Sequence, residues 1–271
     1  MVETNHFADG GDKYARRRPS YPPELAKALA EKCSQTDHVL DVGCGSGQLS
    51  VLLATYFDQV TATDPSHSQI KYSQPHPKIN YLVEPAEAMS LPARSVNLVV
   101  AAQAAHWFDL DAFYAEVKRI ARPNCVLALL SYGVPSMRGD IGERLSRFYW
   151  NDIHEFWPDR RKHVETGYQT LDFPFEEDSL SGFAIKREWT RPDLLGYVDT
   201  WSAIKRAKSA QAYSRIEQFE RDMAKLWPDD IQHHVTWPIS ARVARLNAAP
   251  WRKVRALRMR LRGSTKIFSR P

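Results

Sequence analysis

The stretch VLDVGCGSGQLS, residues 39–50, constrains the fold of this 271-residue chain more than any other feature. An apolar run ends in an acid and continues directly into three glycines at alternate positions, Gly43, Gly45 and Gly47. Glycine adopts positive φ and carries no Cβ, so a turn built this way lets a ligand approach the backbone closely. Because a helical pattern follows, the stretch predicts the first strand–turn–helix unit of an open α/β sheet.

Apolar runs and amphipathic segments alternate through the first half of the chain, and this alternation favours a parallel sheet with helical crossovers. The apolar runs predict strands at residues 39–43, 59–64, 79–84, 96–103 and 126–133. The amphipathic segments predict helices at residues 22–33, 46–57 and 110–122.

The pattern changes after Gly133. Residues 136–182 are rich in aromatic side chains and arginine, with helical spacing in IGERLSRFYWNDIHEFW. A strand is predicted at residues 183–190, two helical stretches follow to about Trp227, and a last strand is predicted at residues 234–246. We therefore expect a sheet completed by an antiparallel pair, with an aromatic helical cap inserted after the fifth strand.

The predicted domain organisation follows from these segments. We expect a single domain over residues 1–246, in which residues 134–182 and parts of 191–233 form the cap. Residues 247–271 form a separate basic tail, with eight basic residues and no acid.

The spacing of the residues near the glycine turn restricts the kind of ligand. A dinucleotide fingerprint would place glycine at position 48, which is Gln48, and no Gly-Lys-Ser/Thr follows to hold a triphosphate. Asp64 ends the second predicted strand, 21 residues after Gly43. A carboxylate at this spacing accepts hydrogen bonds from both hydroxyls of a ribose. The pattern predicts a nucleoside cofactor without a pyrophosphate.

Four motifs in order carry a family resemblance: DVGCGSGQLS, ATDPS, AEAMSLP and NLVVAAQAAHWFD. Together they resemble the class I S-adenosylmethionine-dependent methyltransferases, and within these the trans-aconitate methyltransferase-like group. The likeness covers about residues 7–246. It implies a Rossmann-like sheet of seven strands, mostly parallel with an antiparallel last strand. It also implies S-adenosylmethionine as cofactor and methyl transfer to a small molecule.

The resemblance also implies which residues contact the cofactor. The three glycines would pass its methionine end, Asp64 the ribose, and Ala86 and Glu87 the adenine. Gln103 would lie beside the sulfonium, and Tyr14, in a segment that resembles a lid, would lie near it as well. The expected cofactor contacts are Tyr14, Gly43, Gly45, Gly47, Asp64, Ala86, Glu87 and Gln103.

The stretch HWFD, residues 106–109, follows the fourth predicted strand and so lies within reach of the acceptor side. We expect His106 to be the catalytic residue, as a hydrogen-bond partner or general base, and Trp107 to form a wall. The alternative is that both only pack at a strand end. Further candidates are Arg17 or Arg18, as a clamp for a substrate carboxylate, and the cap aromatics Tyr168 and Trp201.

Composition argues against several other kinds of protein. Without residues 247–271, the chain holds 29 basic against 32 acidic residues, so its net charge of +5 is no argument for nucleic-acid binding. Three separated cysteines predict no metal site, and no apolar run is long enough for a membrane span. The absence of an apolar leader and the sparse cysteines favour the cytoplasm.

The predicted function is O-methylation of a small carboxylic acid with S-adenosylmethionine. One alternative is N- or O-methylation of a phenol or amine, with His106 as base. The other is a catalytically silent regulatory protein that binds the same cofactor. Nucleic-acid methylation is disfavoured because no N-P-P-Y-type sequence follows the fourth strand.

Overall fold

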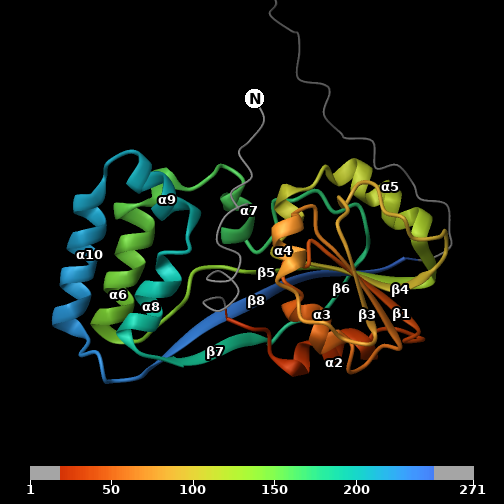
Figure 1. The fold of residues 1–271 in the computed structure, drawn as a ribbon, viewed down its shortest axis with the longest axis horizontal. Coiled ribbons are helices and arrows are strands. Elements are labelled where there is room, and N and C mark those ends of the chain that lie inside the picture. The colour runs from red at the N-terminus through yellow and green to blue at the C-terminus, as the bar shows by residue number, and fades with distance from the viewer. Residues whose placement is uncertain (1–18, 247–271) are drawn as a thin grey trace, which may run out of the picture.

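A computed structural model describes residues 19–246 of the chain, and Figure 1 shows how the elements are arranged. Its centre is a mixed sheet in the order β3-β2-β1-β4-β5-β8-β6, with β7 also paired to β8. The strands are β1 (His38–Val42), β2 (Gln59–Thr63), β3 (Ile79–Leu82), β4 (Val96–Ala102), β5 (Ala121–Tyr132), β6 (Glu177–Asp178), β7 (Ala184–Trp189) and β8 (His233–Leu246).

The five strands from β1 to β5 are parallel. From β1 the chain first adds β2 and β3 on one side and then crosses over to add β4 and β5 on the other side. In an open parallel sheet, such a reversal opens a crevice beyond the carboxyl ends of the strands. The glycine turn follows β1 and therefore lies at that crevice.

Helices cover both faces of the sheet, and a further group gathers at one end. Figure 1 shows α2 and α3 on one face, α5 on the other, and α6, α8, α9 and α10 together at the far end. The helices are α2 (Pro23–Glu31), α3 (Gln48–Leu53), α4 (His67–Lys71), α5 (Leu110–Ile120), α6 (Gly139–Arg147), α7 (Arg161–Glu165), α8 (Arg191–Val198), α9 (Ser202–Ser209) and α10 (Tyr213–Leu226), with single turns η1 (Ala105–Trp107), η2 (Phe148–Asp152) and η3 (His154–Phe156).

Alternation along the strands divides the core into two clusters. Val39 and Leu98 face one way and pack in the cluster that includes Leu25 of α2. Their neighbours in sequence, Leu40 and Val99, belong to the cluster on the opposite face, which packs against α5. Successive side chains of a strand point to opposite faces, so strands buried on both faces read as continuous apolar runs.

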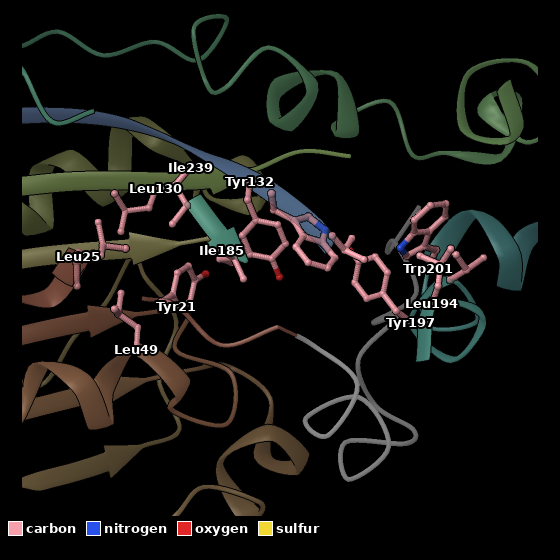
Figure 2. Packing of buried hydrophobic residues seen from close by; sticks show 14 of the residues in the cluster. Tyr21, Leu25, Leu49, Leu130, Tyr132, Ile185, Leu194, Tyr197, Trp201 and Ile239 are labelled. Carbon is pink, nitrogen blue, oxygen red and sulfur yellow. The ribbon is translucent and has the colours of Figure 1, made fainter. Parts of the chain in front are cut away.

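The helical group at the end of the sheet is joined to it by apolar packing. Figure 2 shows the first cluster extending from Tyr21 through Tyr132 and Ile185 to Tyr197 and Trp201. Within that path, Nε1 of Trp237 on β8 donates to the hydroxyl of Tyr197 at 3.3 Å. The long antiparallel β8 thus carries the sheet core into the helical group.

The predicted fold class is confirmed, including the reversed last strand, which pairs antiparallel with β5. Several details differ from the prediction. Within residues 19–246 the sheet has eight strands, because the two-residue β6 pairs with β8 inside a run expected to be irregular. Three helices, rather than two, fill residues 191–226. β5 begins at Ala121 rather than 126, because Ala121 pairs with Val96 across an irregularity in the ladder.

Candidate active site

The glycine turn after β1 adopts the left-handed backbone that its composition predicts. Gly43, Gly45 and Gly47 have φ values of 68°, 58° and 83°. A Cβ on Gly47 would lie 2.7 Å from Cε1 of Tyr81, and one on Gly43 would overlap the Cβ of Ala104. At Gly45 the nearest described atom, Oε1 of Gln69, is 3.7 Å away. The protein's own packing therefore requires glycine at 43 and 47, whereas a Cβ at Gly45 would make only an ordinary van der Waals contact.

Asp64 follows β2 directly and binds the glycine turn. Its Oδ2 accepts a hydrogen bond from the Gly45 N–H at 3.0 Å, and its Oδ1 accepts one from the Ser66 N–H at 2.8 Å. Burial raises the pKa of this carboxyl, and the two N–H groups oppose that rise. A carboxylate oxygen has more than one lone pair. Asp64 can thus hold the turn and still accept two ribose hydroxyls.

Several buried polar atoms around this turn have no hydrogen-bond partner within residues 19–246. Gln69 and Tyr81 lie at the Cβ positions of Gly45 and Gly47, and the others sit at the carboxyl ends of β1, β2 and β4. An unpaired buried polar atom costs free energy, so such a group around one turn indicates a polar ligand. The unpaired atoms are Asp41 Oδ1, Thr63 Oγ1, Gln69 Oε1, Tyr81 OH and Gln103 Oε1.

Asp41 is a site residue to which the sequence interpretation assigned no role. It is 1% exposed, and its Oδ2 accepts from the hydroxyl of Ser50 at 2.6 Å. The pKa of Asp41 is raised to about 7, mainly by burial and also by the charge of Asp64. The hydrogen bond from Ser50 opposes this rise. A positively charged group bound beside Asp41 would favour its ionised form, because an opposite charge offsets both burial and the charge of Asp64. The sequence signal for such a role is an acid one residue before the end of an otherwise apolar strand.

Gln103 and Glu87 are both fixed by hydrogen bonds to the backbone. Gln103 has φ 58°, and its Nε2 donates to the carbonyl of Tyr132 on β5 at 2.7 Å, which leaves its Oε1 unpaired. Glu87 accepts from the N–H of Asp109 at 2.9 Å, at the start of α5. Ala86, expected beside the adenine, is buried at 3% exposure.

On the acceptor side, His106 lies in η1 and binds a residue far along the chain. Its Nδ1 is 2.9 Å from the hydroxyl of Tyr168, which is fully buried. The Nδ1 atom of His106 is thus engaged by a phenol hydroxyl, which can either donate or accept. The structure thus brings together two candidates that lie 62 positions apart.

The surroundings of His106 make it a weak base. Burial lowers the pKa of His106 to about 3, and the charges of Arg161, His163 and Arg160 add to this effect. A general base works best when its pKa lies near the working pH. His106 is therefore neutral at pH 7 and suited to hydrogen bonding rather than proton removal.

The remaining candidates lie in different surroundings. The backbone carbonyl of Trp107 accepts a hydrogen bond from Arg160 at 2.9 Å. The ring centroids of Trp107 and His106 are 4.9 Å apart. Trp201 is buried among cap aromatics, 5.5 Å from Trp157 between ring centroids. The described contacts of Trp201 are all with cap residues. Tyr14, Arg17 and Arg18, as well as the basic tail, lie outside the described residues.

Within residues 19–246, no helix has the length and apolar character needed to cross a membrane. No group of three His, Cys, Asp or Glu side chains in this range is placed to hold a metal ion.

Comparison with known proteins identifies the family. Residues 40–129 match the family model of a methyltransferase domain. A protein of Dictyostelium discoideum named as a methyltransferase is 32% identical over 200 residues, which cover 72% of this chain and 76% of its own. A Saccharomyces cerevisiae protein named as an S-adenosylmethionine-dependent methyltransferase is 29% identical over 145 residues, 50% of each chain. The solved structure named as a type II methyltransferase from Anaeromyxobacter dehalogenans has a TM-score of 0.80 at 39% identity, covering 85% of this chain and 98% of that one.

The sheet, with a glycine turn held by the acid of the neighbouring strand, defines an α/β protein that binds a nucleoside cofactor. With these relatives, the chain belongs to the class I S-adenosylmethionine-dependent methyltransferases. The residues fit that cofactor, which carries an ammonium group, two ribose hydroxyls and an adenine amino group. All of these are donors, and the unpaired atoms of Asp41, Thr63, Gln69 and Gln103 are acceptors.

Proposed function

We propose that this methyltransferase methylates a carboxylate oxygen of a small-molecule acid, within the trans-aconitate methyltransferase-like group that its motifs resemble. The observation that carries the proposal is the chemistry beside η1. His106 is a weak base with Nδ1 engaged by Tyr168, and Arg160 and Arg161 add positive charge near it. A carboxylate is already ionised at pH 7, whereas a phenol or amine must lose a proton.

The cofactor supplies a methyl group on a positively charged sulfur, and this group needs no further activation. The glycine turn and Asp64 would hold its nucleoside, and Asp41 its ammonium group. Gln103 would border the sulfonium, and Ala86 and Glu87 the adenine. These residues orient the donor and exclude water from it. Orientation alone contributes roughly 7–11 kcal/mol to lowering a barrier of this kind.

A methyl-transfer screen tests the proposal. Purified protein is incubated with S-adenosylmethionine carrying a labelled methyl group and with panels of carboxylic acids, phenols and amines. Methyl esters hydrolyse in mild alkali and release volatile methanol, whereas methyl ethers and methylamines do not. We expect label that becomes volatile after alkali. An alkali-stable product would contradict carboxylate methylation.

The two alternatives predict different results. If His106 removes a proton from a phenol or amine, His106→Asn lowers turnover by roughly 10²- to 10⁴-fold. Carboxylate methylation predicts a smaller loss for this variant, because no proton has to be removed. A silent regulatory protein would bind the cofactor and methylate none of the panels.

A further inference from the structure

Arg161, the first residue of α7, lies beside two aromatic rings that pack on each other, Tyr149 and Trp157. Its Cζ lies 4.6 Å from the ring centroid of Trp157 and 5.8 Å from that of Tyr149. Its Nε donates to the hydroxyl of Tyr149 at 2.9 Å. Figure 1 shows α7 between the helical group and the sheet. The guanidinium is thus held rigidly by one edge, and its two terminal nitrogens are left for another partner.

No acid among residues 19–246 forms an ion pair with Arg161. Glu165 lies one helical turn later, where it would ordinarily pair with an arginine at this spacing. Its Oε1 instead accepts from the Tyr149 hydroxyl at 2.7 Å and lies 3.4 Å from Nε2 of His154. A half-buried guanidinium is stabilised by an anion, and the Glu165 carboxylate reaches Arg161 only through the Tyr149 hydroxyl.

A second donor without a partner lies directly beside it. Nε1 of Trp157, in the ring under the Arg161 guanidinium, is buried and has no hydrogen-bond partner within the described residues. An indole N–H can only donate. An unpaired indole N–H and a guanidinium without an ion pair among residues 19–246 thus belong to neighbouring side chains, and both are donors to an oxyanion.

The position of this pair relates it to the reaction. α7 packs against η1, which carries His106, and the charge of Arg161 acts on the ring of His106. Neighbouring Arg160 donates to the backbone carbonyls of His106 and Trp107. Arg161 thus belongs to the element that packs on η1, which carries the candidate residues of the acceptor side.

We propose that Arg161 and Trp157 form the anion-binding end of the acceptor site and hold a carboxylate of the substrate. This inference deepens the proposed carboxylic-acid methylation and rests on it for the identity of the anion. Planar guanidinium groups bind carboxylates through two parallel hydrogen bonds, which fix orientation as well as charge. Arg161 is then a specificity-determining residue that selects acids over neutral acceptors.

Three variants test the site. Arg161→Met removes the charge and keeps an aliphatic stem, and Trp157→Phe removes the indole N–H and keeps a ring. Lys162→Met is the matched control, since it removes one charge from an exposed position of the same helix. Succinate and benzoate serve as probes, with binding followed by tryptophan fluorescence. The acid found in the methyl-transfer screen serves for kinetics.

We expect Arg161→Met to weaken probe binding and raise KM at least tenfold, with cofactor affinity unchanged. Trp157→Phe is expected to weaken binding about threefold or more, and Lys162→Met less than twofold. Arg161→Lys keeps the charge without the planar fork, so it should recover part of the affinity. This variant also keeps the test valid if Arg161→Met fails to fold.

The outcomes separate this inference from the proposed function. Unchanged probe affinity and KM in a folded Arg161 variant, or no saturable probe binding by the wild-type protein, overturns the anion site even if acids are methylated. Arg161-dependent probe binding without methylation of any acid supports the anion site and overturns carboxylic-acid methylation.

Discussion

At the residue scale, the site is built from residues whose conformation or charge is unfavourable without a partner. Gln103 adopts a left-handed backbone, Asp41 is a buried carboxyl with one unpaired oxygen, and His106 is a half-buried neutral imidazole. Strained backbone, unpaired polar atoms and shifted pKa values are common at functional sites, because the ligand or the reaction makes use of them.

Two of the three glycines of the turn, Gly45 and Gly47, should lose different amounts of stability when replaced by alanine. Gly45→Ala adds left-handed strain of about 1–2 kcal/mol without a clash. Gly47→Ala adds the same strain and a Cβ 2.7 Å from Tyr81 Cε1, so it should lower the free energy of unfolding further. Urea unfolding of both variants measures the difference. Equal losses would show that Tyr81 does not constrain Gly47.

His106 should make the protein sensitive to acid. Its folded-state pKa of about 3 lies below the ordinary value of 6.5, so the unfolded chain binds a proton in this window and the folded chain does not. Stability is therefore lost as pH falls from about 6.5 toward 3, by at most about 1.4 kcal/mol per pH unit from this group. Urea unfolding at several pH values should give a flatter profile for His106→Asn. An identical slope would contradict the low pKa.

At the element scale, the segment after α7 positions the acceptor side by binding to β8. Arg242 of β8 donates to the carbonyls of Tyr168 at 3.2 Å and Leu171 at 2.8 Å, pairs with Glu177, and lies 4.6 Å from the Phe173 ring centroid. One side chain of the last strand thus fixes the loop that carries the partner of His106.

Arg242→Met should loosen this loop. The loss of several charge-assisted hydrogen bonds is expected to lower the free energy of unfolding by about 2–3 kcal/mol. The pKa of His106, followed by NMR, should then rise toward its ordinary value as Tyr168 moves away. Arg245→Met, on the same strand with one bond to the Lys32 carbonyl, is the control. An unchanged His106 pKa would show that Tyr168 is held without Arg242.

Some elements were predictable from the sequence, and others were not. The strands from 39 to 103 and the position of Asp64 at the end of β2, beside the glycine turn, follow from local runs and a fixed spacing. The two-residue β6 has no pattern of its own and exists because β8 is long enough to pair with it. The His106–Tyr168 contact joins residues 62 positions apart, and the lack of an ion pair at Arg161 among residues 19–246 depends on where Glu165 points. Neither has a local signal.

At the scale of the whole molecule, one apolar cluster includes both sheet and cap residues (Figure 2). We propose that the sheet and the helical group form one domain, as the sequence predicts. Unfolding in urea should then be a single transition, with tryptophan fluorescence and far-ultraviolet circular dichroism coinciding. Two separated transitions would show that the helical group unfolds independently.

The central claim is that the turn after β1 and the acid after β2 bind S-adenosylmethionine. Isothermal titration calorimetry of Asp64→Ala tests it most directly, with Asp58→Ala, exposed before the opposite end of β2, as control. The claim predicts saturable binding by the wild-type and Asp58→Ala proteins, and at least a tenfold loss of affinity in folded Asp64→Ala. Equal affinity in all three proteins, or no binding by the wild type, would contradict it.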